Sequence, residues 1–170
     1  HRGSDPANPG WTRTYTYNER SQIESAKQSN RLTDTTIGGT TETYSVVGDG
    51  YDSHGNMLHM PHLPIMLWDF KDQLQMTQRQ AVNAAATDGV QHQGERTYYV
   101  YDAAGQRVRK VTERQATAGQ IPTRSKERIY LGGFEVYREY NDNGNTLTLE
   151  RETLHIMDDK QRIVLMETKT

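Results

Sequence analysis

The sequence contains no cysteine, which excludes a disulfide-stapled fold and every metal site built on thiolate ligands. Large apolar side chains are also scarce, because the chain has only two phenylalanine and two tryptophan residues and is 33% hydrophobic. A single-layer or thinly covered β-sheet, burying mainly one face of each strand, has this kind of composition. The chain is long enough for one domain, and we expect residues 1–170 to form one.

Long hydrophobic runs and a strong charge bias are missing as well. The longest apolar stretch, Leu63–Trp68, is interrupted by Pro64 and is far shorter than a membrane span. We therefore expect no transmembrane segment. The formal net charge of −2 gives no reason to expect nucleic acid or an acidic membrane as a partner. Nothing in the sequence calls for a cofactor.

Tyrosine, by contrast, is abundant, and it recurs within one short pattern. The pattern is an aromatic residue, then Asp or Asn, two variable residues, a small or polar residue, and a step from polar to apolar. The two fullest copies are Tyr51–Met57 and Tyr101–Arg107. Four weaker copies begin at Tyr17, Trp68, Tyr140 and Met157.

The copies are regularly spaced. They begin at residues 17, 51, 68, 101, 140 and 157, so successive starts lie close to one or two units of 17 residues apart. Such a period is typical of an array of repeated structural units. Seventeen residues suit two short strands and their two turns, so we expect each unit to be a strand, a tight turn and a returning strand.

The chemistry of one copy predicts a β-hairpin. Aromatic residues in alternation favour a strand, and the following Asp or Asn can bond to the backbone two residues later and so start a turn. The glycine three residues after the Asp supplies the positive φ that such hairpin loops need. We expect positive φ at Gly55, Gly105 and Gly144. The fold class should be all-β, with successive antiparallel hairpins forming a ribbon-like sheet.

The residues that we assign to the turn motif share this structural role. They are Tyr17, Asn18, Tyr51, Asp52, Gly55, Trp68, Asp69, Tyr101, Asp102, Gly105, Tyr140, Asn141, Gly144 and Asp158.

These copies also resemble a known repeat. The pattern Tyr-x-Tyr-Asp-x-x-Gly is similar to the YD repeat of RHS proteins and of the Tc insecticidal toxin complexes. The stretches Thr97–Val111, Arg128–Tyr137 and Glu152–Asp159 most resemble the repeat region of the Tc toxin C component and of bacterial RHS toxins. The resemblance covers essentially the whole chain and is looser before Tyr51.

The resemblance implies a structural function. In that family the repeats form a β-sheet ribbon that spirals into a hollow shell around a toxic C-terminal polypeptide. It implies a non-catalytic wall segment of a secreted bacterial toxin, with the remaining repeats and the enclosed polypeptide as partners. About six units are too few to close a cavity, and the single Asp-Pro pair, Asp5-Pro6, is not where the family has its self-cleavage motifs. The chain begins within a unit, so we expect a fragment of a longer chain.

Three polar segments interrupt the units. Residues 1–12 are rich in proline, glycine and Asx residues and should be irregular. Residues 78–95 and 112–125 lack alternation and should be long hairpin loops, with a turn or two of helix near Ala84–Ala86.

Enzymatic and metal-binding alternatives are weaker. His54, His59 and His62 lie close together in the sequence, but Pro61 and Pro64 interrupt regular structure there and no acidic residue lies within the cluster. The Asp158-Asp159 pair with Asp142 suggests paired carboxylates, yet these residues occupy turn positions of the repeat.

A binding function is the main alternative to the wall function. Exposed tyrosine rings can stack on sugars, so the chain could instead be a carbohydrate- or receptor-binding module. The residues that we consider for ligand stacking are Tyr98, Tyr99, Tyr130 and Tyr137. Aromatic residues at strand spacing more often pack against neighbouring strands.

The terminal strands of such a ribbon should also bind other chains. Strands near Arg13–Tyr17 and Ile163–Met166 would lack a neighbour on one side, and unpaired strand edges bind other strands. We expect self-association through these sheet edges.

Overall fold

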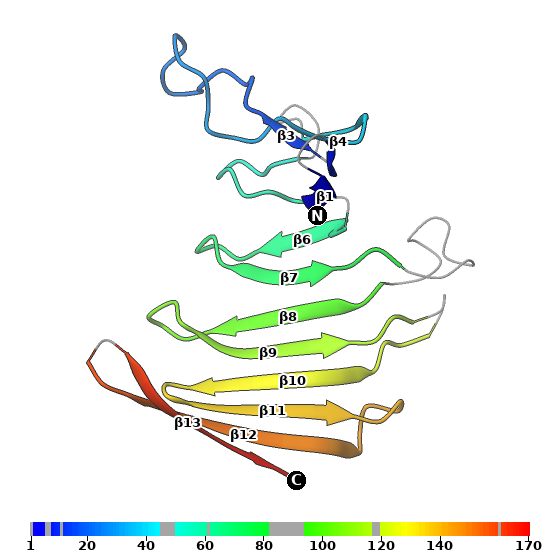
Figure 1. Ribbon diagram of the computed structural model, residues 1–170, viewed down its shortest axis with the longest axis vertical. Helices are drawn as coiled ribbons and strands as arrows, with labels where there is room; N and C mark the ends of the chain where they lie inside the picture. Colours follow the sequence, from blue (N-terminus) through cyan, green and yellow to red (C-terminus); the bar gives the residue numbers. More distant parts are fainter. Residues whose placement is uncertain are drawn as a thin grey trace. The chain divides into compact units, whose positions relative to one another are not determined.

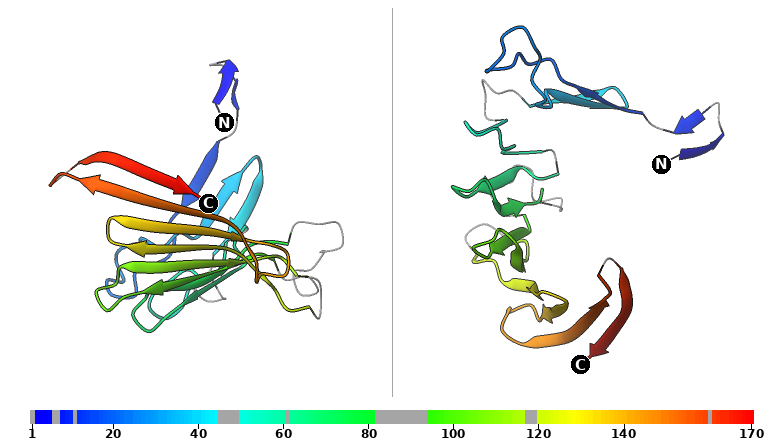
Figure 2. Two further views of the ribbon diagram at one scale, coloured as in Figure 1. Left: turned by 90° about the horizontal axis from the view of Figure 1, so that it is seen from below. Right: turned by 90° about the vertical axis from the view of Figure 1, so that its left-hand side faces the viewer.

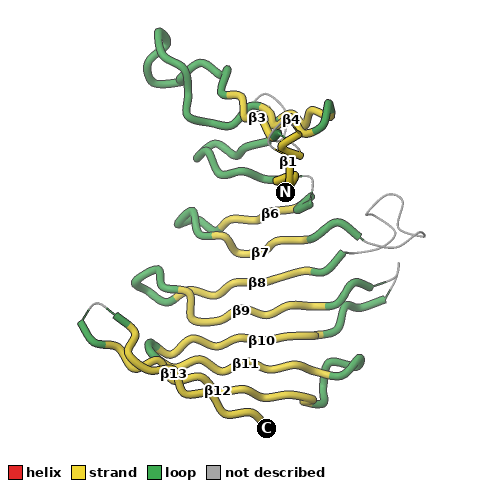
Figure 3. The backbone as a smooth tube through the Cα atoms, in the orientation of Figure 1, coloured by secondary structure: helices red, strands yellow, loops and turns green. Residues whose placement is uncertain are grey.

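The computed structural model describes residues 2–5, 8–10, 12–44, 50–60, 62–81, 94–116, 120–159 and 161–170, and the statements below concern these residues. They form thirteen strands and no helix, which confirms the all-β prediction (Figure 3). Accordingly, no helix in these ranges is long and apolar enough to span a membrane. The proposed helical turn at Ala84–Ala86 lies outside the described residues.

The chain divides into two compact units, His1–Pro61 and His62–Thr170. In the first unit, β1 (Arg2–Asp5) and β2 (Asn8–Gly10) pair antiparallel. Residues 1–12 were expected to be irregular, and this expectation is wrong for these two strands. Pro9 fits in β2 because a strand bonded on one side only does not need every N–H group.

A three-stranded antiparallel sheet follows in the first unit. Its order is β3 (Arg13–Thr16), β4 (Asp34–Ile37) and β5 (Thr40–Thr43). Gly38 and Gly39 join β4 to β5, and both have positive φ, 55° and 85°, as a two-residue type I′ hairpin requires.

The second unit is one eight-stranded antiparallel sheet in which every strand pairs with its sequence neighbours (Figure 1). Its strands are β6 (Ile65–Trp68), β7 (Leu74–Gln78), β8 (Arg96–Tyr101), β9 (Arg107–Glu113), β10 (Arg124–Leu131), β11 (Phe134–Tyr140), β12 (Leu147–Met157) and β13 (Arg162–Lys169). This order confirms the predicted succession of hairpins. The right-hand view of Figure 2 shows that β12 and β13 curl out of line with the preceding strands.

The two faces of this sheet carry different side chains, since residues paired across neighbouring strands point to the same face. The register Val111–Glu127–Arg138–Glu150 defines one face, which we call the Glu127 face. The register Lys110–Arg128–Tyr137–Arg151 defines the other, the Tyr137 face.

Burial is shallow and occurs on both faces. Among the described residues no side chain of any size is completely buried. On the Glu127 face the most buried residues include Met76, Glu127 and Val136, and on the Tyr137 face they include Met66 and Thr97. The expectation of a thin sheet is met, but its burial is not confined to one face, because neighbouring side chains within the sheet cover one another.

The spacing of the motif has a different structural meaning from the predicted one. The 33 residues from Trp68 to Tyr101 carry two strands, β7 and β8, and the 17 from Tyr140 to Met157 carry only β12. A 17-residue step therefore corresponds there to a single strand with its connection, whereas the 39 residues from Tyr101 to Tyr140 carry three strands, β9, β10 and β11. The prediction of a complete hairpin per step is wrong because the loops and strands are longer than assumed.

Candidate functional site

The turn at Asp102 shows how the motif works. Asp102 Oδ1 accepts hydrogen bonds from the backbone N–H groups of Ala104 and Gln106, both at 2.9 Å. The N–H of Gly105 donates to the Asp102 carbonyl at 3.1 Å, and Gly105 has a φ of 82°. One carboxylate oxygen thus fixes the loop between β8 and β9, and the predicted positive φ is confirmed.

Two other copies repeat this geometry. Asp52 Oδ1 accepts from the N–H groups of His54 and Asn56 at 2.9 and 2.8 Å, and Gly55 has a φ of 93°. Asn56 Nδ2 also donates to Asp52 Oδ2, and these bonds outweigh the effect of partial burial, so the pKa of Asp52 is lowered. Asp69 Oδ1 accepts the same two bonds, from the N–H groups of Lys71 and Gln73, at 2.8 and 3.0 Å.

The Asp69 turn has no glycine at the position that needs positive φ. Asp72 occupies it with a φ of 59°, and it is the only described non-glycine residue at positive φ. Aspartate tolerates this conformation better than most residues, which explains why this weaker copy of the motif still forms the turn.

In the two fullest copies of the motif, the tyrosine ties the turn to an earlier part of the chain. Tyr101 Oη donates to the carbonyl of Leu74, at the start of β7, at 3.0 Å. Tyr51 Oη donates in the same way to the carbonyl of Leu32 at 2.8 Å. Burial raises the pKa of both phenols. The motif therefore connects successive hairpins as well as closing its own.

Two later copies vary the loop length. Asn141 Oδ1 accepts from the N–H of Thr146, one residue further than in the Asp102 turn, and Gly144 has a φ of 75°. A Cβ at Gly144 would lie 2.9 Å from the backbone N of Arg124, so a side chain there would also collide with the neighbouring loop. The Asp158 turn is shorter, with the Asp158 N–H bonded to the Gln161 carbonyl at 2.8 Å.

The first copy does not form this turn. Asn18 donates its N–H to Thr33 Oγ1 at 3.2 Å and stands beside a different loop. Ser21 Oγ accepts from the N–H groups of Ile23 and Glu24 there, so serine takes the place expected for Asn18. Tyr17 is 47% exposed, unlike Tyr51 and Tyr101, which are half-buried.

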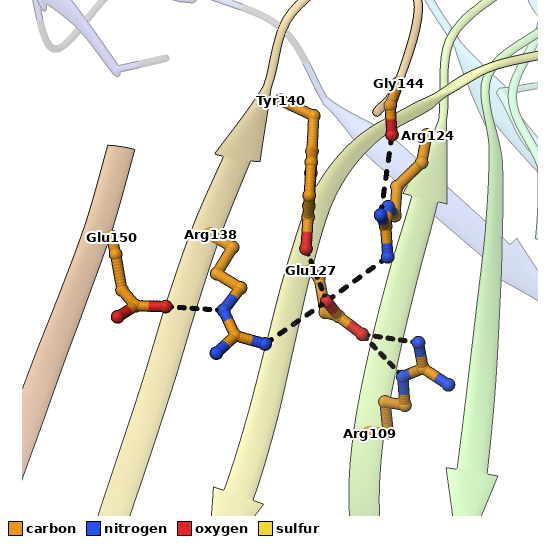
Figure 4. A network of polar contacts seen from close by, with 7 residues as sticks. All are labelled: Arg109, Arg124, Glu127, Arg138, Tyr140, Gly144 and Glu150. Carbon is orange, nitrogen blue, oxygen red and sulfur yellow. Dashed lines mark hydrogen bonds and ion pairs between the residues drawn. The ribbon is translucent and has the colours of Figure 1, made fainter. Parts of the chain in front are cut away.

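A charged network at the centre of the sheet was not expected from the sequence. Figure 4 shows Glu127 of β10 surrounded by side chains from β9, β10 and β11. Glu127 accepts from Arg109 Nε at 2.6 Å and from Tyr140 Oη at 2.8 Å. The guanidinium groups of Arg124 and Arg138 lie 3.6 and 3.9 Å from it.

The environment of Glu127 favours its charged form. The side chain is only 4% exposed, and burial alone would raise its pKa. Hydrogen bonds from Tyr140 and Arg109, with the positive charges of Arg109 and Arg124, outweigh burial and lower the pKa. Arg138 extends the network to β12 by its 2.6 Å contact with Glu150.

Arg114 joins the loops at one end of the same sheet. Its guanidinium donates to the carbonyls of Arg124 and Tyr140, and it lies 3.6 Å from a carboxylate oxygen of Asp142. Asp142 lies in the β11–β12 turn, whereas Asp158 lies in the β12–β13 turn, at opposite ends of β12. The structure therefore does not bring these carboxylates together as a catalytic pair.

The rings or hydroxyl groups of the four candidate stacking residues already contact other side chains of the sheet. Arg107 lies over the rings of Tyr99 and Tyr130, at 5.8 and 4.9 Å from their centroids. Arg128 and Arg151 both lie 5.1 Å from the centroid of the Tyr137 ring.

Tyr98 is on the other face of the sheet. Its hydroxyl donates to Glu113 at 3.1 Å. The four candidate tyrosines therefore do not form one open aromatic surface, and the contacts described for them are with side chains on neighbouring strands.

The histidine cluster is divided between the two units. His54 and His59 belong to the first unit and His62 to the second, and the His59 ring packs 6.3 Å from that of Tyr44. Within the described ranges no group of three or more His, Asp or Glu residues is arranged to hold a metal ion.

The surface hollows are open, and their linings mix polar and apolar groups. One of about 300 Å³ lies beside the Asp69 and Asp102 turns and contains Phe70, whose side chain is 85% exposed. Another of about 410 Å³ lies at the opposite end of the strands and is lined by the Arg79–Glu95 ion pair, Arg114 and Tyr140. In this hollow Arg114 already bonds to the loops and Tyr140 to Glu127.

The sequence carries only a weak signal for the Glu127 network. Glu127, Arg138 and Glu150 lie directly opposite one another on neighbouring strands once the register is known, but nothing in the sequence fixes that register beforehand.

No protein-family model matches this chain, and no curated protein matches it significantly.

Proposed function

We propose that this chain is a wall segment of an RHS/YD-repeat shell that encloses a toxic C-terminal polypeptide in a secreted bacterial toxin. The supporting observation is the repeated turn, in which one acidic side chain closes a loop, as at Asp52, Asp69 and Asp102, and in which Tyr101 also bonds to the earlier strand β7. Such a unit extends a sheet in one direction indefinitely. Its partners would be the remaining repeats of the shell and the enclosed polypeptide.

The arrangement of charge supports a mechanical rather than a catalytic function. The most buried carboxylate, Glu127, is held by Arg109 and Tyr140 and so has no free proton-transfer position. Its bonds join three adjacent strands. A wall needs this kind of cross-linking because a thin sheet has little apolar core to hold it together.

The alternative, a carbohydrate- or receptor-binding module, has less support. Sugar stacking needs an open aromatic face. Arginine side chains lie over Tyr99, Tyr130 and Tyr137 on the face where those rings gather. A glycan could reach these rings only by displacing the cation–π partners.

The decisive experiment uses the gene on both sides of the segment that encodes residues 1–170. Sequencing should show further Tyr-Asp-x-x-Gly units and a C-terminal polypeptide after them. The complete product should then protect that polypeptide from protease until the protein is denatured. A variant combining Asp102→Ala with Gly105→Val should increase cleavage, while Ala104→Val in the same loop should not.

Three results would reject the wall function. The first is an adjoining lectin or adhesion domain without a C-terminal cargo. The second is a C-terminal polypeptide that is digested equally fast in the native and denatured protein. The third is specific binding on a glycan array that is abolished by Tyr137→Ala, which would favour the binding module instead.

A further inference from the structure

The two faces of the eight-stranded sheet differ in charge. On the Glu127 face the charges of the strand residues balance, since these residues are Arg96, Arg109, Arg124, Arg138, Glu113, Glu127, Glu150 and Glu152. On the Tyr137 face cationic residues outnumber glutamates, since these residues are Arg107, Lys110, Lys126, Arg128, Arg151, Arg162, Lys169, Glu135, Glu139 and Glu167. The Tyr137 face is therefore basic, although the chain as a whole has a formal net charge of −2.

Three of these arginines lie next to β-bulges, where alternation alone does not fix the face, and their contacts assign them. Arg107 lies beside the β8–β9 bulge, and its guanidinium lies over the ring of Tyr130 on the Tyr137 face. Arg162 lies beside the β12–β13 bulge and contacts His155, which alternates onto the Tyr137 face. Arg124 lies beside the bulge in β10 and belongs to the Glu127 network on the other face.

A row of positive side chains crosses the Tyr137 face. It consists of directly opposed residues from five successive strands, β9 to β13, namely Lys110, Arg128, Tyr137, Arg151 and Lys169. The pairs that define the row are in regular register, away from the bulges. A further strand at either edge of the sheet would pair in its plane and leave its faces uncovered, so the exposure of the row does not depend on what lies beside β13.

Two lysines on this face lack a counter-ion. Within the described residues, Lys110 and Lys126 form no ion pair, whereas Arg128 lies 2.8 Å from a carboxylate oxygen of Glu135. Lys110 is also half-buried. A cation that has lost part of its hydration and has no partner gains from an incoming carboxylate more than a fully solvated one does.

The two lysines flank a small hollow in the same face. It has a volume of about 100 Å³, and its lining also includes Thr112, Arg128 and Tyr137. A water molecule takes about 30 Å³, so the hollow has room for one carboxylate group. Positive charge surrounds this space on two adjacent strands, β9 and β10.

From these observations we infer that the Tyr137 face is a docking site for an acidic peptide segment of a partner protein, with one carboxylate of that segment in the hollow between Lys110 and Lys126. The segment would lie along the row and bring further carboxylates toward Arg151 and Lys169. This docking site is a property of the sheet face and stands independently of the wall function.

An acidic peptide fits this face better than a nucleic acid strand does. Glu135, Glu139 and Glu167 stand beside the row, and a strand with a charge on every nucleotide would meet them. An extended peptide places every second side chain on one side, so its carboxylates can face the row while neutral residues lie near the glutamates. Base stacking is hindered too, because arginine guanidinium groups lie over the rings of Tyr130 and Tyr137.

The binding test uses the 170-residue chain and two fluorescent decapeptides. One peptide alternates glutamate and serine, so that all its carboxylates lie on one side when it is extended. The other has glutamine in place of each glutamate. Fluorescence anisotropy at low ionic strength should show the glutamate peptide binding about tenfold more tightly than the glutamine peptide, and added salt should weaken it. A thymidine decanucleotide is the third probe and should bind more weakly than the glutamate peptide.

Two variants and one matched control locate the contact. Lys110→Gln and Lys126→Gln should each weaken binding of the glutamate peptide about fivefold, because each removes a cation from the hollow. Their circular dichroism spectra and melting temperatures should stay those of the parent, since neither lysine forms an ion pair in the folded chain. Lys71→Gln removes the same charge from an exposed lysine in the β6–β7 turn, outside the row, and should change the affinity less than about twofold.

Three results would overturn the proposal. The first is a glutamine peptide that binds as tightly as the glutamate peptide. The second is an equal loss of affinity in Lys71→Gln and in the two hollow variants, which would mean that only the net charge of the chain matters. The third is tighter binding of the thymidine decanucleotide than of the glutamate peptide, which would make the face a nucleic-acid site instead.

Discussion

The turn at Asp102 and the network at Glu127 hold the same sheet together in opposite ways. At the turn, one exposed aspartate bonds to N–H groups two and four residues away. At the network, a side chain that is 4% exposed receives contacts from residues 18 positions earlier, at Arg109, and 13 positions later, at Tyr140. The first interaction is local and solvated, and the second is distant in sequence and buried.

This difference separates two tasks. The turns decide which residues of consecutive strands face each other, since the loop length sets the register. The Glu127 network decides whether neighbouring hairpins stay together, because it connects β9 and β11 through β10 and continues through Arg138 to Glu150. We therefore expect the loss of a turn to cost less than the loss of the network.

The largest effect should come from Glu127→Ala. The change removes the shared partner of Arg109 and Tyr140 and leaves their polar groups without it. Because the arginines are partly exposed and can be rehydrated, we expect a loss of about 2–3 kcal/mol in the free energy of unfolding rather than the full cost of a dry pair. Urea-induced unfolding of the parent and of Glu127→Ala measures this difference in free energy.

Glu152→Ala is the matched control for that experiment. Glu152 is an exposed glutamate on the same face of the sheet, opposite Val136. Its removal should change the unfolding free energy by less than about 0.5 kcal/mol. Equal effects of the two substitutions would mean that the Glu127 network contributes no more than surface charge.

The next effect should come from the turn glycine. Gly105→Val places a β-branched residue at a φ of 82°, and its Cβ would lie 2.9 Å from Gln73 Nε2. We expect a loss of about 1–2 kcal/mol, mainly from backbone strain, since the Gln73 side chain can move. Ala104→Val, one position earlier in the same loop, should cost much less in thermal denaturation. Indistinguishable melting curves for the two variants would refute the turn assignment.

A smaller effect should follow from the aspartate itself. Asp102→Ala removes an acceptor of two backbone hydrogen bonds at a solvated site, so we expect a loss of about 1 kcal/mol. Asp102→Asn should cost less than Asp102→Ala, because an amide oxygen can accept the same bonds, as Asn141 Oδ1 does from Thr146. If asparagine proved as costly as alanine, the charge of the carboxylate would matter more than its geometry.

The same contrast explains what the sequence could predict. Asp102 and Gly105 carry their partners within the same few residues, so their bonding and positive φ follow from local chemistry alone. The order of β6 to β13 follows in part, because tight turns join β6 to β7, β8 to β9 and the strands from β10 to β13, whereas longer connections join β7 to β8 and β9 to β10. The Asp69 turn was also found, although Asp72 takes the place of glycine.

The remaining features depend on register, which the local pattern does not fix. Glu127 looks like any surface glutamate in the sequence, and only the alignment of β10 with β9 and β11 brings Arg109 and Tyr140 to it. The stacking hypothesis for Tyr137 had the same weakness, since it required knowing that Arg128 and Arg151 are its cross-strand neighbours. Asn18 shows the opposite error, in which a matching motif forms no matching turn because Ser21 competes for the backbone N–H groups.

The smallest expected effect is a change of slope in the acid dependence of stability. The pKa of Glu127 is lowered in the folded chain, so the folded state binds its proton less readily than the unfolded state does. The stabilisation is therefore present above the pKa of an unfolded glutamate, about 4.3, and is lost as the pH falls through the lower folded value. In Glu127→Gln this group no longer titrates, so the unfolding free energy should fall less steeply with acid below about pH 4.3. Urea titrations of the parent and of Glu127→Gln at a series of pH values compare the two slopes. Parallel curves of unfolding free energy against pH for the parent and Glu127→Gln would show that the arginines around Glu127 do not favour its charged form. The solvated turn and the buried network would then differ in burial and sequence distance but not in electrostatics.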